Sequence, residues 1–170
     1  MRRIVPRVPP PPSAVRPVDL LHHRPPYLLI DEVVETSPDH AVTTYTIRGD
    51  EFFITGHFPG APILPGAMMQ EMSTQTGGVL IASHHNPMAG DYDTHDPYHN
   101  PTALGVLVKV ASARYRGFAR PGQTVTARVE LRERVDDLFS MVGQLTVDDR
   151  TILRNEFQLT NIPSDTLRGS

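Results

Sequence analysis

Apolar and polar residues alternate through most of the second half of the chain. Aspartate pairs at 136–137 and 148–149 fall where hairpin turns would reverse the chain. In the first half, 27–34 predicts a buried strand, 41–47 is rich in threonine and valine as strands are, and 18–22 predicts a short helical turn. Four further strands are predicted in the second half: 103–115, 124–134, 138–147 and 151–159.

One helix is predicted in the middle of the chain, beginning at Pro65, because proline is favoured at the first helical position. Its small residues allow another element to approach closely, so we expect the helix to be buried nearly all round by a curved antiparallel sheet. Long strands after a single central helix predict an α+β fold. The apolar face comprises Met68, Met69, Met72, Thr76, Val79 and Leu80, and the small face Ala67, Ser73, Thr74, Gly77 and Gly78.

Composition narrows the class of protein. A length of 170 residues with 39% hydrophobic content predicts one domain with a core of its own. The absence of cysteine excludes disulfides, thiolate metal sites and a cysteine nucleophile. A net charge of -3 gives no basic field for nucleic acid. No apolar run reaches the length of a membrane span, and none follows the basic start at 1–3, so we expect a cytoplasmic protein without a secretory signal.

Prolines define the ends of the expected domain. Residues 1–17 are so rich in proline that we expect a flexible extended arm, with a docking role as the less favoured alternative. We expect residues 18–163 to form the single domain and 164–170 a tail.

Within this domain, 84–102 reads as an inserted loop. Four histidines there lie among three aspartates, a mixture able to bind a divalent metal. Their irregular spacing favours a polar loop or a lid over the site instead. We therefore expect no metal and no cofactor. These residues are His84, His85, His95, His99, Asp91, Asp93 and Asp96.

The chemistry is concentrated around the start of the helix. Residues 56–66 read Gly-His-Phe-Pro-Gly-Ala-Pro-Ile-Leu-Pro-Gly, so His57 lies just ahead of the helix. Glu71 and Gln75 follow inside it, one turn apart at the edge of the methionine face. A neutral imidazole and a protonated carboxyl group together remove a proton from one carbon and a hydroxyl from the next. The chain therefore has the residues of a dehydratase.

The same residues carry a family resemblance. The motif at 57–66, with an acid fourteen residues after the histidine and a glutamine four later, is similar to that of the 3-hydroxyacyl-acyl-carrier-protein dehydratases of fatty-acid synthesis. His-Arg-Pro-Pro-Tyr-Leu-Leu-Ile-Asp at 23–31 resembles the family's His-Arg-x-Pro-Phe-Leu-Leu-Val-Asp segment. Residues 50–53 and 113–122 match two more blocks in the family's order.

This resemblance implies a hotdog fold and a reaction. The expected reaction is dehydration of (3R)-3-hydroxyacyl thioesters to trans-2-enoyl thioesters, in fatty-acid or related acyl or polyketide synthesis. The family's acid comes from the partner subunit, which implies a homodimer or a trimer of dimers. The other implied partner is an acyl carrier protein; neither a nucleic acid nor a membrane is expected.

Each site residue has an expected role. His57 is the candidate base for the C2 proton, since a neutral imidazole accepts protons at cytoplasmic pH. Glu71 is the candidate acid for the C3 hydroxyl, because an apolar setting raises a carboxyl pKa. Gly66 offers a backbone N–H and the helix dipole to the thioester oxygen. Gln75 orients Glu71 or a water. Alternatively, His57 makes both proton transfers while Glu71 positions the hydroxyl.

Two further groups of residues are assigned to substrate and partner. Coenzyme A thioesters stay open as alternative substrates. A cluster of four basic residues would attract the acidic surface of a carrier protein if the cluster lies near the mouth of the acyl tunnel. Otherwise, the alternation of the strand simply places part of this cluster in solvent. The expected acyl tunnel residues are Phe58, Pro59, Met68 and Met72, and the expected carrier-docking residues are Lys109, Arg114, Arg116 and Arg120.

The chain departs from the family pattern along the helix. Residues 67–75 read Ala-Met-Met-Gln-Glu-Met-Ser-Thr-Gln where the family usually has Val-Leu-x-x-Glu-Ala-Met-Ala-Gln, so the tunnel shape and the acyl chain length are open. Glutamate rather than aspartate at 71 disfavours isomerase activity. Two alternatives remain: a hotdog thioesterase in which Glu71 activates water, and a silent acyl-binding subunit. The presence of both His57 and Glu71 in the chain favours a dehydratase over these two alternatives.

Overall fold

The computed structural model describes residues 15–88 and 90–168. Most of the expected proline-rich arm, up to residue 14, lies outside the described residues. A 3-10 turn, η1 (Pro17–Asp19), begins the described chain. Within the described part, no helix is long and apolar enough to cross a membrane.

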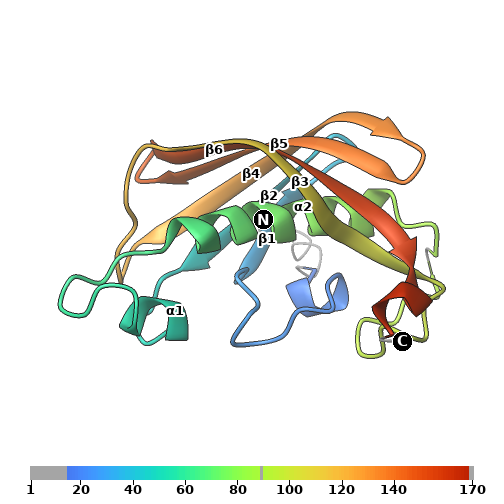
Figure 1. The fold of residues 1–170 in the computed structure, drawn as a ribbon, viewed down its shortest axis with the longest axis horizontal. Helices are drawn as coiled ribbons and strands as arrows, with labels where there is room; N and C mark the ends of the chain where they lie inside the picture. Colours follow the sequence, from blue (N-terminus) through green and yellow to red (C-terminus); the bar gives the residue numbers. More distant parts are fainter. Residues whose placement is uncertain (1–14, 89, 169–170) are drawn as a thin grey trace, which may run out of the picture.

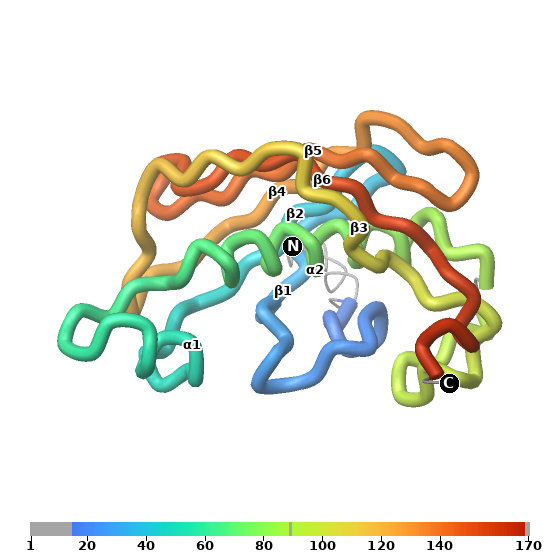
Figure 2. The backbone as a smooth tube through the Cα atoms, viewed as in Figure 1, coloured from blue at the N-terminus to red at the C-terminus, as the bar shows by residue number. Residues whose placement is uncertain are grey.

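A six-stranded antiparallel sheet curves over one long helix, α2 (Gly66–His84), as Figures 1 and 2 show. A shorter helix, α1 (Phe52–Thr55), precedes it, and a 3-10 turn, η2 (Ser164–Leu167), follows the last strand. The strand order is β1-β2-β4-β5-β6-β3. This arrangement is the α+β hotdog fold that was expected. The strands are β1 (Glu32–Thr36), β2 (His40–Thr46), β3 (Thr102–Tyr115), β4 (Thr124–Val135), β5 (Leu138–Val147) and β6 (Arg150–Pro163).

The helix is buried on every side through its middle, as its small residues predicted. All residues from Met72 to Ile81 are buried. A Cβ added at Gly77 would lie 2.8 Å from the sulfur of Met141, and one at Gly78 would lie 3.1 Å from Leu21. The glycines therefore set how closely the sheet and the N-terminal segment approach the helix.

Polar side chains join α2 to the sheet inside the core. Ser73 donates to Oδ1 of Asn155 at 3.3 Å, and Nδ2 of Asn155 donates to Oε1 of Gln70 at 2.9 Å. One turn farther along the helix, the hydroxyls of Thr43 and Thr76 lie 2.8 Å apart. These bonds pair groups that would otherwise be costly to bury.

Several expected boundaries differ from the structure, and one of them differs for an informative reason. The helix begins at Gly66, with Pro65 as its extended N-cap. The last strand runs on to Pro163, because its end pairs with the start of β3.

The strand expected over 27–34 begins only with β1, at Glu32. The residues before it form a turn instead, in which the backbone N–H groups of Tyr27 and Leu28 donate to the carbonyl of Arg24. Leu29 and Ile30 are buried, but they cover the helix rather than join the sheet.

The hairpin turns formed where aspartate pairs predicted them. Asp136 has φ 52°, and Asp148 and Asp149 have φ 48° and 61°. Aspartate tolerates this left-handed region better than most residues, so these positions suit tight reversals of direction.

Strand β3 forms one edge of the sheet. It pairs with β6 on one side and, among the described residues, with no strand on the other. The edge is apolar as well as open: Leu107, Val108 and Val110 are 39%, 53% and 44% exposed. An unpaired apolar edge of this length is a surface that proteins normally cover.

Candidate active site

His57 lies in the exposed loop between α1 and α2. Its Nδ1 is 3.3 Å from the carbonyl oxygen of Ile63. Since a carbonyl only accepts, this bond requires a proton on Nδ1, so that in the neutral ring the lone pair lies on Nε2. The Phe58 ring lies 4.3 Å from the imidazole, centroid to centroid. The loop thus presents a histidine nitrogen able to accept a proton.

Glu71 extends from the second turn of α2 into a largely buried position, with its side chain 15% exposed. Its Oε1 accepts a hydrogen bond from Nε2 of Gln75 at 2.9 Å. Burial raises the pKa of Glu71 above its ordinary value, and hydrogen bonds from Gln75 and Tyr27 partly oppose that rise. The net direction favours the protonated acid, as the apolar setting predicted.

Gln75 joins three parts of the site. Besides Glu71, its Nε2 donates to the carbonyl of Tyr27 at 2.8 Å, and its Oε1 accepts from the N–H of Leu29 at 2.8 Å. The residue is 1% exposed. The amide therefore ties the segment before β1 to the helix and leaves Glu71 little freedom to turn away.

His23 and Tyr27 also surround Glu71. The Nε2 of His23 is 3.8 Å from Oε1 of Glu71, and the His23 and Tyr27 rings stack with centroids 5.9 Å apart. Burial, and then the charges of His22 and Arg24, lower the pKa of His23. Because His23 is pushed toward its neutral form and Glu71 toward its protonated one, the contact is not a conventional ion pair. Neither residue was a site candidate in the sequence, where no spacing connects them to Glu71.

The other expected site residues take up varied positions. Gly66 is the first residue of α2, where a backbone N–H has no partner within the helix. A Cβ there would lie 2.9 Å from the Tyr115 ring. Of the four tunnel candidates, Phe58 and Pro59 are exposed, Met68 is half-buried and Met72 is 1% exposed in the core. Met68 packs against the core cluster that contains Met72.

Three of the expected docking residues lie beside surface cavities. Arg116 and Arg120 line a cavity of about 460 Å³, which they share with Arg150, a residue that sequence reasoning did not select. Arg114 lines a second cavity of about 310 Å³, also bordered by Arg116. Lys109 lines neither of the two. The three arginines are therefore exposed around the end of β3 and the β5–β6 turn, and Lys109 lies apart from them in the middle of β3.

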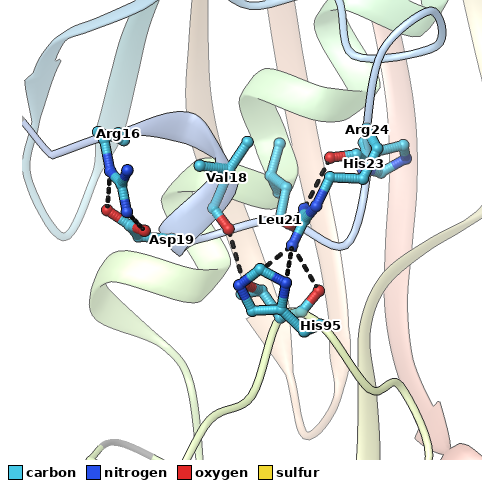
Figure 3. A network of polar contacts seen from close by, with 8 residues as sticks. Arg16, Val18, Asp19, Leu21, His23, Arg24 and His95 are labelled. Carbon is cyan, nitrogen blue, oxygen red and sulfur yellow. Dashed lines mark hydrogen bonds and ion pairs between the residues drawn. The ribbon is translucent and has the colours of Figure 1, made fainter.

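The inserted loop is fixed to the N-terminal segment (Figure 3). Arg24 donates from one nitrogen to the carbonyls of Leu21 and His23, at 2.7 and 2.8 Å, and from the other to the carbonyl of Thr94 at 2.9 Å. The hydroxyl of Thr94 donates to the carbonyl of Val18 at 2.6 Å. In the described ranges, no three His, Asp or Glu side chains lie close enough together to hold a metal ion.

No hydrogen bond or ion pair connects His57 to Glu71 within residues 15–88 and 90–168. The histidine loop is exposed, whereas the carboxyl group faces the segment before β1. One chain therefore supplies both groups, but it joins them by neither a hydrogen bond nor an ion pair.

The fold and these residues define the class: a hotdog protein with a histidine loop ahead of a helix that carries a buried acid. Residues 21–156 match the family model described as a FabA-like domain. The chain belongs to this family, which confirms the resemblance found in its motifs.

Relatives agree with this assignment. The chain is 32% identical over 149 residues to the 3-hydroxyacyl-[acyl-carrier-protein] dehydratase FabZ of Myxococcus xanthus (strain DK1622), covering 87% of this chain and 90% of that protein. To the protein of the same name in Solibacter usitatus (strain Ellin6076), it is 31% identical over 137 residues, covering 81% and 77%.

Solved structures support the fold. The dehydratase heterocomplex ApeI:P from Xenorhabdus doucetiae matches with a TM-score of 0.72 at 19% identity, over 90% of this chain and 95% of that one. A hypothetical thioesterase from Streptococcus pneumoniae, solved with coenzyme A, matches with a TM-score of 0.56 at 13% identity, over 78% and 85%. At these identities the likeness extends to the fold alone.

Proposed function

We propose that this chain dehydrates (3R)-3-hydroxyacyl thioesters, carried by an acyl carrier protein, to trans-2-enoyl thioesters. One observation carries the proposal: a largely buried glutamic acid, whose pKa burial raises, is held by Gln75 on the helix that follows the His57 loop. The relatives named as 3-hydroxyacyl-acyl-carrier-protein dehydratases support the substrate class. We also expect the reaction to take place in the cytoplasm, which cell fractionation would test.

His57 and Glu71 each transfer one proton in the proposed reaction. The free Nε2 of His57 takes the proton from C2, and the protonated carboxyl of Glu71 gives its proton to the departing C3 hydroxyl, which leaves as water. The charge that grows on the thioester oxygen lies within reach of the Gly66 N–H at the positive end of α2. In the alternative scheme His57 makes both transfers and Glu71 holds the hydroxyl.

A second copy of the chain completes this site. Among the described residues, no hydrogen bond or ion pair joins His57 to Glu71. The apolar edge of β3 is open there for pairing with another β3. Antiparallel pairing of two such edges would continue the sheet across a two-fold axis. We therefore propose a homodimer, alone or in a trimer of dimers, in which His57 of one subunit works with Glu71 of the other.

The carrier protein would dock on the arginine-rich surface. Arg116, Arg120 and Arg150 border one cavity, and Arg114 borders the next. Guanidinium groups suit both the phosphate of a phosphopantetheine arm and the carboxylates of an acidic partner. Replacing Arg116 and Arg120 by glutamine should raise KM for carrier-linked substrate at least about fivefold and leave a short synthetic thioester unaffected.

Hydration of a crotonyl thioester tests the reaction in reverse. Loss of the enoyl absorbance would be followed for the wild type, His57→Ala and Glu71→Gln, with free thiol measured in parallel. We expect hydration by the wild type and a fall of at least about 100-fold in each variant. The exposed residues His99 and Glu133 give matched controls, His99→Ala and Glu133→Gln. Thiol release without hydration would instead indicate a thioesterase, and neither activity a silent acyl-binding subunit.

Mixing the two inactive variants tests whether the site is shared. If His57 and Glu71 come from different subunits, a reassembled one-to-one mixture should regain about one quarter of wild-type activity, because half of the dimers carry one intact site. If both residues of a site come from the same chain, no mixture regains activity.

A further inference from the structure

His22 joins the N-terminal segment to the inserted loop through both nitrogens of its ring. Its Nδ1 lies 3.0 Å from the carbonyl oxygen of Thr94, and its Nε2 lies 3.4 Å from Nδ2 of Asn100. The ring also meets that of Tyr92 edge to face, with centroids 5.4 Å apart. Thr94 and Asn100 are 7% and 1% exposed, so both polar contacts are made inside the loop rather than at its surface.

The amide of Asn100 can face His22 in only one orientation. Its Oδ1 accepts from the backbone N–H of Asp93 at 2.9 Å, and its Nδ2 donates to the Asp93 carbonyl at 2.7 Å. Exchanging the two ends of this amide would place a donor against the N–H and an acceptor against the carbonyl. The amide nitrogen therefore stays on the side of His22, where it can only donate.

These two partners determine the protonation state of His22. A carbonyl only accepts, so Nδ1 carries a proton, and an amide nitrogen only donates, so Nε2 presents its lone pair. His22 is therefore the neutral tautomer with its proton on Nδ1. A second proton, on Nε2, would point at an N–H of Asn100 and would place a positive charge on a half-buried ring. The contact with Asn100 and the charged imidazole therefore exclude each other.

The groups around His22 do not reverse this preference. Burial has the largest effect on the pKa of His22 and lowers it. The hydrogen bond to Thr94 raises this pKa, the charge of Arg24 lowers it, and the net direction is downward. The other titratable groups that face the ring are His23 on its own segment, and Tyr92, Asp93 and Asp96 on the loop.

We propose that His22 is a pH-sensitive switch for the inserted loop. While His22 is neutral, its contact with Asn100 helps to hold residues 90–100 against the N-terminal segment. When Nε2 is protonated, this contact is lost and the loop separates from the segment. The closed loop should therefore be most stable above the ordinary histidine pKa of 6.5. Below it, the ratio of closed to open loop should fall by at most about tenfold per pH unit.

The switch lies next to the proposed active site. The carbonyl of Thr94 that pairs with His22 also accepts from Arg24 at 2.9 Å. The guanidinium of Arg24 donates in turn to the carbonyl of His23 at 2.8 Å. The Nε2 of His23 lies 3.8 Å from Oε1 of Glu71. Opening of the loop in acid therefore removes contacts from the segment beside Glu71, although the switch itself does not depend on the dehydratase reaction.

Amide hydrogen exchange of the full chain tests the switch without any measurement of activity. Protection factors, which correct for the pH dependence of intrinsic exchange, should fall about three- to eightfold over residues 90–100 between about pH 7 and about pH 5.5. His22→Gln keeps an acceptor toward Asn100 and cannot ionise, so it should not show this fall. His99→Gln removes a histidine that is 50% exposed on the same loop, and it should keep the wild-type fall.

The tautomer of His22 gives a second measurement, made on the wild type alone. In protein labelled with ¹⁵N and ¹³C, the ring nitrogens of His22, assigned through its own backbone, should show a proton on Nδ1 and none on Nε2 at about pH 7.5. A proton on Nε2 at this pH overturns the proposal. A wild-type protection that stays constant with pH, or one that falls equally in His22→Gln, overturns it as well. None of these outcomes bears on the dehydratase assignment.

Discussion

The amide of Gln75 is bonded to the carboxyl group of Glu71, with Nε2 and Oε1 2.9 Å apart, one turn along the same helix. The same amide pairs with the backbone at Tyr27 and Leu29, which lie far away in the sequence. Orientation of the proposed acid and closure of the N-terminal segment over α2 therefore depend on one side chain.

Replacing Gln75 by leucine should affect stability and activity together. The N–H of Leu29 and the carbonyl of Tyr27 would lose their partners, so the free energy of unfolding should fall by about 2–4 kcal/mol. Urea denaturation at fixed protein concentration would measure the loss. Gln144→Leu removes only a bond to Thr151 on the outer face of the sheet and should cost less than about 0.5 kcal/mol. Equal losses in the two variants would contradict the structural role assigned to Gln75.

The raised pKa of Glu71 makes stability depend on pH in a definite direction. The folded state binds this proton more tightly than the unfolded chain, so its stabilising contribution is complete below the ordinary pKa of 4.5 and is lost as pH rises through the raised value. Glu71→Gln cannot ionise. The free energy of unfolding of Glu71→Gln, minus that of the wild type, should therefore increase from about pH 4 to about pH 7.5 when both are measured by urea denaturation. The exposed Glu133→Gln should show no such trend.

Charges on the open edge of β3 should prevent the proposed dimer. Val108→Glu combined with Val110→Glu places carboxylates on residues that are 53% and 44% exposed, where paired edges would bury them. Light scattering after gel filtration should report a monomer, and hydration activity should fall at least about 100-fold because the site is divided. Val135→Glu, at a residue 55% exposed near the β4–β5 turn, should stay dimeric. An unchanged mass for the double variant would rule out pairing through this edge.

Loss of Arg24 should loosen the inserted loop. Arg24→Ala removes the guanidinium that joins the carbonyls of Leu21, His23 and Thr94, so amide exchange over 90–100 should accelerate by about ten- to a hundredfold. Arg16 offers the control, since its pairing with Asp19 at 2.7 Å is exposed and worth little (Figure 3). Exchange that stays at the wild-type rate in Arg24→Ala would show that other contacts hold the loop.

Much of the fold was predictable because its signals are local. Alternation marks strands with one buried face, the aspartate pairs mark turns that need positive φ, and the glycines of the central helix indicate close packing on several sides. The elevated pKa of Glu71 followed from the same pattern, since a carboxyl group on an apolar helix edge is removed from water. The failed strand at 27–31 shows the limit: burial of Leu29 and Ile30 was real, but the helix rather than a neighbouring strand supplied it.

Local patterns along the chain were enough to predict the α+β class, the helix, the hairpins and the positions of His57 and Glu71 around the start of that helix. Folding of distant segments onto one another placed His23 and the backbone of Tyr27 around Glu71, and Arg150 beside the expected docking arginines. Periodicity records which face of an element is buried, but it does not record which distant segment covers that face. Contacts between such segments are fixed by packing and hydrogen bonding of the whole chain, and these leave no repeat in the sequence.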